Sequence, residues 1–208
     1  WAGMAKETAH QIGTPLSSLI GWLEILKLDN VEESTIVEIE NDITRLQTIT
    51  DRFSKIGSEP VLEKRDIIED TKNTVDYLQT RVSQQVNFYF KAPQHPVFVE
   101  INPALHSWTI ENLVKNAIDA MKGKGSLNIV ISELEDMVKI SITDTGKGIP
   151  KNQFSKVFEP GFTTKKRGWG LGLSLTKRIV QEYHKGKIKV AHSEIGKGTT
   201  MQISYKTT

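Results

Sequence analysis

The first 56 residues carry two apolar stripes at helical spacing, and these constrain the fold more than any other feature of the sequence. The first stripe comprises Ile12, Leu16, Leu19, Leu23 and Leu26, and the second comprises Ile36, Ile39, Ile43, Leu46, Thr50, Phe53 and Ile56. Steps of three and four residues place each set on one helix face, and the second series is close to a heptad repeat. The polar stretch "KLDNVEES" between them predicts a short turn, and so an antiparallel hairpin. One hairpin cannot bury both stripes, so we expect two copies to pair as a homodimeric four-helix bundle.

The pattern changes after "GSEP", residues 57–60, and from there helical and strand-like segments alternate. Helices are predicted at 63–82, 103–121 and 172–186, and strands at 86–92, at 96–101, in a hairpin over 126–146 and in a final pair. Such a run indicates helices on one face of a mixed sheet. The predicted class is therefore α+β, with a helical hairpin over 1–58 and an α/β two-layer sandwich over 59–208.

Composition and charge exclude several classes of protein. The chain has no cysteine, which rules out disulfides and cysteine-ligated zinc. No apolar run approaches the roughly 18 residues of a membrane helix, so no membrane contact is expected for this segment. The first 57 residues carry 5 Lys+Arg and 9 Asp+Glu and the remainder 22 and 16, a bias too dispersed to indicate nucleic-acid binding. Because the sequence opens on "WAGMAKETAH", with helical pattern and no initiator Met, we expect a fragment of a longer protein.

The helix predicted at 103–121 carries Asn112 and Asn116, which are four residues apart and therefore share one face. Their amide oxygens, with Lys115 beside them, suit a hydrated Mg²⁺ and the phosphates that it bridges, because Mg²⁺ prefers oxygen ligands and keeps several waters. Taken alone, such a pair is more often a surface or capping feature.

The segment "DTGKGIP" predicts a place where a flat ring is held. Asp144 ends a predicted strand and can accept a hydrogen bond from an exocyclic amine, while Gly146 and Gly148 let the backbone come close. A simple turn explains the same residues, and alone it is the better explanation.

The segment "FEPGFTTKKRGWGLGLSL" predicts a phosphate-binding loop. Gly168, Gly170 and Gly172 alternate just before a helix, an arrangement in which backbone N–H groups receive phosphate, and "KKR" at 165–167 adds positive charge. Phe158 and Phe162 either anchor this loop to the core or are plain core residues.

Together with "GKGTTMQI" at 196–203, these segments resemble, in order, the sequence boxes of the Bergerat ATP-binding fold over about residues 100–205. The resemblance implies ATP and Mg²⁺ as cofactors, with Asn116 as a ligand of the metal. It implies an ATP site formed by Asn112, Lys115, Asn116, Asp119, Asp144, Gly146, Gly148, Ile149, Phe158, Phe162, Thr163, Thr164, Lys165, Gly168, Gly170, Leu171, Gly172, Leu173 and Thr199.

Gyrase, mismatch-repair and heat-shock-chaperone ATPases share this fold. They resemble one another in having a glutamate that acts as the general base for the water molecule that attacks ATP. That glutamate stands four residues before the second helix asparagine, where this sequence has Asn112. Glu111 is one residue off, about 100° round the helix, and is expected to point elsewhere. The predicted site therefore binds ATP without an internal hydrolytic base, and the nucleophile should come from outside the domain.

The stretch "HQIGTPL", residues 10–16, resembles the phosphoacceptor box of sensor histidine kinases, in which a dimeric hairpin precedes an ATP-binding domain of this type. The resemblance implies that His10 is the phosphoacceptor, since a neutral imidazole presents a lone pair at cellular pH. Pro15 removes the N–H that bonds back to Gln11, so a bend is expected there. A packed histidine beside an accidental kink is the alternative.

Two neighbours of His10 modify this expectation. The family usually has Glu or Asp at the position of Gln11, whose Oε1 can orient the imidazole by accepting from Nδ1–H but cannot take a proton. Thr14 resembles a residue that positions water for dephosphorylating the partner, or else it bonds back to its own helix.

The resemblance thus implies an ATP-dependent protein-histidine kinase that autophosphorylates His10 and passes the phosphoryl group to an aspartate of a response-regulator receiver domain. It implies a cytoplasmic location, either as a cytoplasmic protein or as the cytoplasmic part of a membrane-bound sensor. Two alternatives stay open. One is a hydrolytic ATPase or clamp of the gyrase and chaperone type, which Asn112 and the phosphoacceptor box argue against. The other is a pseudokinase or dimeric scaffold that binds nucleotide without transferring phosphate, which Gln11 keeps in consideration.

Overall fold

The computed structural model describes residues 2–28, 31–56, 60–82, 84–165 and 170–208. For residues 2–11, 13–14, 45, 48–49 and 51–56 the description covers the backbone only. The chain divides into two compact units, Trp1–Pro60 and Val61–Thr208. Within the described ranges, none of the helices combines the length and the apolar character that a membrane crossing requires.

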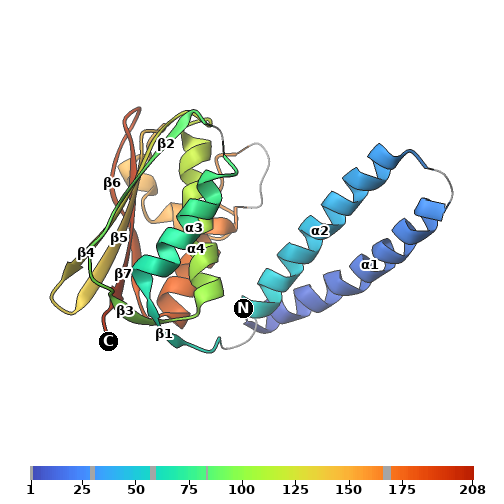
Figure 1. The fold of residues 1–208 in the computed structure, drawn as a ribbon, viewed down its shortest axis with the longest axis horizontal. Coiled ribbons are helices and arrows are strands. Elements are labelled where there is room, and N and C mark those ends of the chain that lie inside the picture. Colours follow the sequence, from blue (N-terminus) through green and yellow to red (C-terminus); the bar gives the residue numbers. More distant parts are fainter. Residues whose placement is uncertain (1, 29–30, 57–59, 83, 166–169) are drawn as a thin grey trace. The chain divides into compact units, whose positions relative to one another are not determined.

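The first unit is a hairpin of two antiparallel helices, α1 (Ala2–Leu28) and α2 (Glu33–Ile56) (Figure 1). Its small core consists of Leu16, Leu23 and Ile43, with Ile36 and Ile39 partly buried against them. Leu19, which the stripe places with this core, is 45% exposed, and Trp22, outside the stripe, is 61% exposed. The hairpin alone therefore leaves apolar surface uncovered, and pairing across a dimer stays a prediction.

The second unit is built on a five-stranded sheet with the order β2-β4-β5-β7-β6. Its strands are β2 (Val86–Lys91), β4 (Gly125–Leu134), β5 (Met137–Asp144), β6 (Lys187–Glu194) and β7 (Gly198–Lys206). β2 and β4 are parallel, whereas the other neighbours are antiparallel. A separate antiparallel pair is formed by β1 (Glu63–Asp66) and β3 (Phe98–Ile101).

Helices lie against one face of this sheet (Figure 1). They are α3 (Ile67–Gln79), α4 (Pro103–Ala120) and α5 (Gly172–Arg178), which continues as a π-helical turn over Ile179–Tyr183, and two short 3-10 turns cover Lys151–Gln153 and Lys156–Phe158. Every second residue of β5 is buried, and Val138, Ile140 and Ile142 are at most 1% exposed. The core thus lies between the helices and one face of a mixed sheet, which confirms the predicted α+β class.

The helix predicted to begin at residue 63 begins at Ile67 instead. Residues 63–66 form β1 and pair with β3, so this part of the prediction is wrong. A short charged run carries no periodicity that separates helix from strand, and pairing with a distant segment decides between them. Asp66 then caps α3, because its Oδ1 accepts from the N–H of Ile68 at 3.0 Å. The same oxygen also accepts from the N–H of Val97 at 3.2 Å.

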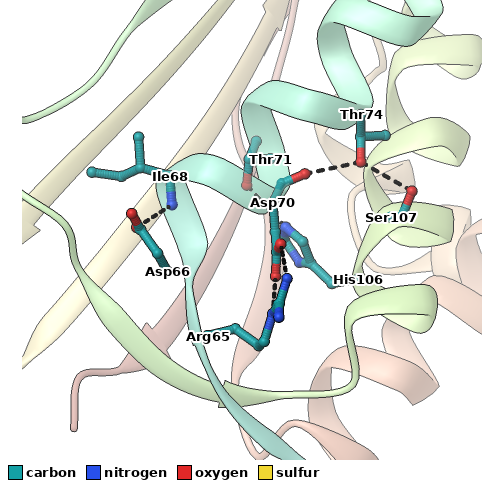
Figure 2. A network of polar contacts seen from close by, with 8 residues as sticks. All are labelled: Arg65, Asp66, Ile68, Asp70, Thr71, Thr74, His106 and Ser107. Carbon is teal, nitrogen blue, oxygen red and sulfur yellow. Dashed lines mark hydrogen bonds and ion pairs between the residues drawn. The ribbon is translucent and has the colours of Figure 1, made fainter.

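A polar network joins β1, α3 and the beginning of α4 (Figure 2). Its side-chain pairs are Arg65 with Asp70, Thr71 with His106, and Thr74 with Ser107. The Thr71 Oγ1 lies 2.9 Å from the Nε2 of His106, and both side chains are fully buried. The two threonine contacts therefore join α3 to α4, and the Arg65–Asp70 pair joins β1 to α3.

His106 also belongs to a buried aromatic cluster with His184 and Tyr205. The Tyr205 ring makes edge contacts to both imidazoles, with centroids 6.0 Å and 5.8 Å apart. The backbone N–H of Asn102 donates to the Nε2 of His184 at 3.1 Å. Burial lowers the pKa of His106 to about 3 and that of His184 to about 4. Both rings are therefore neutral in the folded protein near pH 7.

Candidate functional site

Helix α4 carries four of the residues predicted to bind ATP, namely Asn112, Lys115, Asn116 and Asp119. The helix begins after Asn102, whose side chain accepts from the N–H of Leu105 at 3.1 Å, and Pro103 occupies its first turn. This cap fixes where the helix starts and so which side chains share a face.

Asn112 joins α4 to α5. Its Nδ2 donates to the Oγ1 of Thr176 at 2.7 Å, and Thr176 is buried. Gly172 lies so close that an added Cβ would stand 2.6 Å from the Asn112 Oδ1. Asn112 therefore holds the glycine-rich start of α5, a role that the sequence analysis did not predict for it or for Thr176.

Asn116 and Asp119 are bridged by a lysine from a distant segment. The ammonium of Lys165 lies 2.9 Å from the Asn116 Oδ1 and 2.6 Å from the Asp119 Oδ2. In the residue before Lys165, the Oγ1 of Thr164 accepts from the Lys147 ammonium at 2.8 Å. The two oxygens of α4 thus already face one cation.

Glu111 is engaged on its own helix. Its Oε1 accepts from the ammonium of Lys115 at 2.6 Å, one turn further along α4. Glu111 is the carboxylate closest in sequence to the position of a hydrolytic base, and Lys115 is a lysine predicted to lie near phosphate. Each of these two residues is therefore paired with the other.

Asp144 ends β5 in a buried position, 5% exposed, with β4 and β7 on either side. Its Oδ1 accepts from the N–H of Gly146 at 2.7 Å, and the backbone of Thr199 also donates to its carboxylate. Burial raises the pKa of Asp144, and these two backbone bonds oppose the rise. A carboxylate has about four acceptor positions, so capacity remains for a further donor.

The two glycines after Asp144 allow a close backbone approach. A Cβ on Gly146 would stand 2.6 Å from the backbone of Ala120, at the end of α4, and one on Gly148 would stand 2.2 Å from the carbonyl oxygen of Glu194. Gly148 also has a φ of +75°. A Cβ is therefore excluded at both positions, because the loop packs against the end of α4 and the end of β6.

Ser193 is a second polar residue that the sequence analysis missed. Its Oγ accepts from the N–H of Ile149 at 2.7 Å, donates to the carbonyl of Gly198 at 3.0 Å, and lies 2.9 Å from the Oγ1 of Thr199. It thereby joins the loop after Asp144 to the turn between β6 and β7. Neither Ser193 nor Thr176 lies in a motif, so only their tertiary contacts reveal them.

The residues predicted around the glycine-rich loop lie between Phe158 and α5. Phe158 is buried, and Phe162 and Leu173 are half-buried against the same core. The N–H of Gly161 donates to the carbonyl of Gly170 at 3.0 Å, which closes the base of the loop. Thr163 is exposed, Leu171 is half-buried, and Gly168 lies outside the described residues.

The residues predicted to accept and release the phosphoryl group lie on the other unit. The backbone of His10, Gln11 and Thr14 is helical within α1, and their side chains are outside the description. Pro15 is inside the same helix, one turn after Gln11, and the bend expected there stays a prediction. The loss of its N–H leaves the Gln11 carbonyl without its usual helical donor.

The side-chain oxygens of Asn116 and Asp119 on α4 are suitable ligands for the Mg²⁺ of a bound nucleotide. Mg²⁺ takes oxygen ligands and usually relies on phosphates and waters rather than on a complete protein cage. In the part of the chain that the structure describes, no group of three or more His, Cys, Asp or Glu could hold a metal. The ammonium seated on Asn116 and Asp119 shows that these oxygens can hold a cation.

The chain is similar to known proteins over nearly its whole length. The family of histidine kinase-, DNA gyrase B-, and HSP90-like ATPases matches residues 105–208. Sporulation kinase E of Bacillus subtilis is 31% identical over 212 aligned residues, which cover 97% of this chain and 28% of the relative. Sensor histidine kinase ZraS of Escherichia coli K12 is 31% identical over 209 residues, 96% of this chain and 44% of the relative. The chain thus spans less than half the length of these relatives.

The chain is also similar to solved structures of histidine kinases. The catalytic domain of histidine kinase ThkA is 26% identical with a TM-score of 0.63, over 70% of this chain and 95% of that one. ThkA in complex with response regulator protein TrrA matches 99% of this chain and 61% of that one, at 25% identity and a TM-score of 0.67. Full-length ShkA in complex with AMPPNP, at 18% identity and a TM-score of 0.76, covers 99% of this chain and 46% of that one and supports the fold alone.

Proposed function

Because this chain belongs to the family of histidine kinase-, DNA gyrase B- and HSP90-like ATPases, we propose that it is the core of a two-component sensor histidine kinase. In this proposal, residues 59–208 bind Mg-ATP, and residues 1–58 provide dimerisation and the phosphoacceptor His10. An aspartate on a response-regulator receiver domain then takes the phosphoryl group from His10. The activity belongs in the cytoplasm, where ATP is supplied.

The observation that carries the proposal is the engagement of the side chains around the position of a hydrolytic base. Asn112 stands at that position, and its amide is committed to Thr176. The neighbouring carboxylate, Glu111, accepts from Lys115. A site in which these groups are occupied supports transfer to an external nucleophile better than activation of water.

The nucleotide contacts follow from the chemistry of each residue. Asp144 accepts from the exocyclic amine of adenine, and Gly146 and Gly148 allow the ring to approach the backbone. Asn116 would hold Mg²⁺ through its amide oxygen, and the ion would supply positive charge that offsets the charge of the phosphates.

His10 acts as the nucleophile. Its neutral Nε2 lone pair forms a bond to the γ-phosphorus while the bond from that phosphorus to the bridging oxygen breaks and ADP departs. Gln11 orients the ring by accepting from Nδ1–H. In the second transfer, a carboxylate oxygen of the receiver forms the new bond to phosphorus, and the electrons of the P–N bond return to Nε2.

Two partners are part of the proposal. A second copy of the chain covers apolar surface that one hairpin leaves exposed on α1 and α2, including Leu19 and Leu46. A receiver domain docks near His10, and the similarity to ThkA, which was solved with a response regulator, supports this. Thr14 positions water for dephosphorylating the receiver, and Thr14→Ala should lose that activity while retaining autophosphorylation.

The test is incubation of the chain with γ-labelled ATP and Mg²⁺. We expect protein-bound label that is stable in base and labile in acid, and that is lost in His10→Ala while ATP binding persists. Steady release of phosphate without protein-bound label would favour a hydrolytic ATPase. Nucleotide binding with neither outcome would favour a scaffold, the second candidate, which the glutamine at position 11 makes worth testing.

A further inference from the structure

Lys165 makes a contact that its predicted role beside phosphate does not explain. Its ammonium lies between the Asn116 Oδ1 and the Asp119 Oδ2, at 2.9 Å and 2.6 Å. The two acceptors are three residues apart on α4 and therefore on the same face of that helix. Lys165 reaches them from a segment more than 40 residues later in the sequence.

The two nearby lysines, Lys115 and Lys147, contact other residues than Asn116 and Asp119. Lys115, also on α4, pairs with Glu111 at 2.6 Å, and Lys147 donates to Thr164, the residue just before Lys165. The bond from Lys147 restrains the side chain of Thr164. Asp119 is thus the carboxylate that Lys165 contacts, and Asn116 shares the same ammonium.

An ammonium and Mg²⁺ compete for the same oxygen. A lysine ammonium is a compact, strongly hydrated point charge, and Mg²⁺ is a small cation with strict preferences for oxygen ligands. Two such cations on one amide oxygen repel each other, because they lie within a few ångströms. Asn116 can therefore serve Lys165 or Mg²⁺, but not both at once.

We propose that Lys165 holds the cation position on Asn116 when no nucleotide is bound, and that Asp119 is the positioning residue that keeps it there. Mg²⁺ takes Asn116 when Mg-ATP binds, and Lys165 moves from Asp119 to the phosphates. This exchange rests on the proposed function, since it requires that Mg-ATP binds at α4. Asp119 then limits nucleotide affinity, because ATP has to draw Lys165 away from it.

The size of the effect follows from the exposure of the pair. The side chains of Lys165 and Asp119 are 44% and 54% exposed. Exposed ion pairs contribute little, so the need to break this contact when ATP binds should weaken the binding by about two- to fivefold. Removing the carboxylate should therefore tighten ATP binding by that factor while Lys165 is present.

A double-mutant cycle tests this dependence in a His10→Ala chain, which removes phosphoryl transfer. ATP affinity is measured by calorimetry in EDTA and again with Mg²⁺, for Asp119→Asn, Lys165→Met and the double variant. Removing a carboxylate near phosphates tightens binding in any background, so the informative quantity is the difference between backgrounds. We expect Asp119→Asn to tighten ATP binding about two- to fivefold more when Lys165 is present than in the Lys165→Met background. An equal or smaller effect with the lysine present would overturn the proposal.

The matched control is the Lys72–Asp76 pair, an exposed i, i+4 pair on α3. Lys72→Met and Asp76→Asn make the same changes of charge on a different helix. They should leave ATP affinity unchanged within about twofold, the spread expected for independent surface sites.

A second measurement needs no nucleotide. In a chain with ¹³C- and ¹⁵N-labelled lysine, the Cε–Nζ signal of Lys165 is assigned by its loss in Lys165→Met. It should shift in Asp119→Asn without nucleotide, and shift in the parent chain when Mg-ATP is added. An unchanged signal in Asp119→Asn refutes the contact, whatever the nucleotide data show. A shift in Asp119→Asn with no ATP binding in any variant supports the contact and refutes the proposed function instead.

Discussion

Acidification should destabilise the second unit through its two buried histidines. His106 and His184 have pKa values that burial lowers to about 3 and about 4, whereas an unfolded histidine titrates near 6.5. The nearby carboxylate of Asp70 opposes the shift in His106, and His184 adds to it. As the pH falls below 6.5, the unfolded chain takes up protons that the folded chain refuses. The stabilising contribution is therefore complete above pH 6.5 and is lost progressively towards pH 3–4.

The magnitude can be worked out at pH 5. Each histidine is then about 1.5 pH units below its unfolded pKa and still above its folded pKa. Each therefore removes about 2 kcal/mol from the free energy of unfolding, and the pair removes about 4 kcal/mol. Because small proteins have total stabilities of about 5–15 kcal/mol, this loss should be easily measured.

The assay is urea denaturation of the full chain at pH 8 and pH 5, followed by tryptophan fluorescence and far-UV circular dichroism. His106→Gln should lose about 2 kcal/mol between the two pH values, where the parent chain loses about 4 kcal/mol. His184→Gln gives an independent second variant if His106→Gln folds poorly. His95→Gln is the control, because His95 is 65% exposed in its pair with Glu133 and should keep the parent's pH dependence. The reasoning fails if His106→Gln and His184→Gln both retain the full pH dependence.

Three further outcomes are expected. Gly148→Ala should destabilise the chain more than Gly123→Ala in thermal unfolding. Both glycines have a φ of +75°, but only a Cβ at position 148 would collide with another backbone atom, the Glu194 oxygen at 2.2 Å. Equal effects would show that left-handed strain of about 1–2 kcal/mol explains both substitutions. Asp144→Asn should lower ATP affinity about 10- to 100-fold and raise that for GTP in competition binding, because the amide can donate to a carbonyl; unchanged base preference would remove Asp144 from the adenine site. Gln11→Glu should raise the initial rate of autophosphorylation about tenfold, since a charged acceptor stabilises the imidazolium better, and no change would contradict the role given to Gln11.

The predictable parts of this molecule are those set by local periodicity. The spacing of Asn112 and Asn116 places them on one helix face whatever the rest of the chain does. The bond from Asn112 to Thr176 spans 64 residues, and no local pattern announces it. The same holds for Lys165, whose charge suggested phosphate but whose contacts are Asn116 and Asp119.

The wrong and missing predictions also depend on contacts between segments that are distant in the sequence. Residues 63–66 were expected to be helical, and pairing with β3 makes them a strand. His106 and His184 gave no signal in the sequence, because a histidine becomes buried only through packing between distant elements. The apolar stripes contain the residues of the hairpin core, Leu16, Leu23 and Ile43, but Leu19 of the same stripe is 45% exposed. Trp22 lies outside the stripes, and its exposure becomes visible only when the hairpin is built.

The position of β7 determines when the candidate site can first exist during synthesis. β7 lies between β5 and β6, and Asp144 pairs in register with Thr199. A ribosome-bound chain that has emerged only as far as β6 therefore has an open edge on β5 and lacks the backbone of Thr199 beside Asp144. The candidate site can be completed only after Thr199 has left the ribosomal tunnel. Until then, the nascent chain exposes an unpaired central strand, a stage at which chaperones or the ribosome surface would have to shield it.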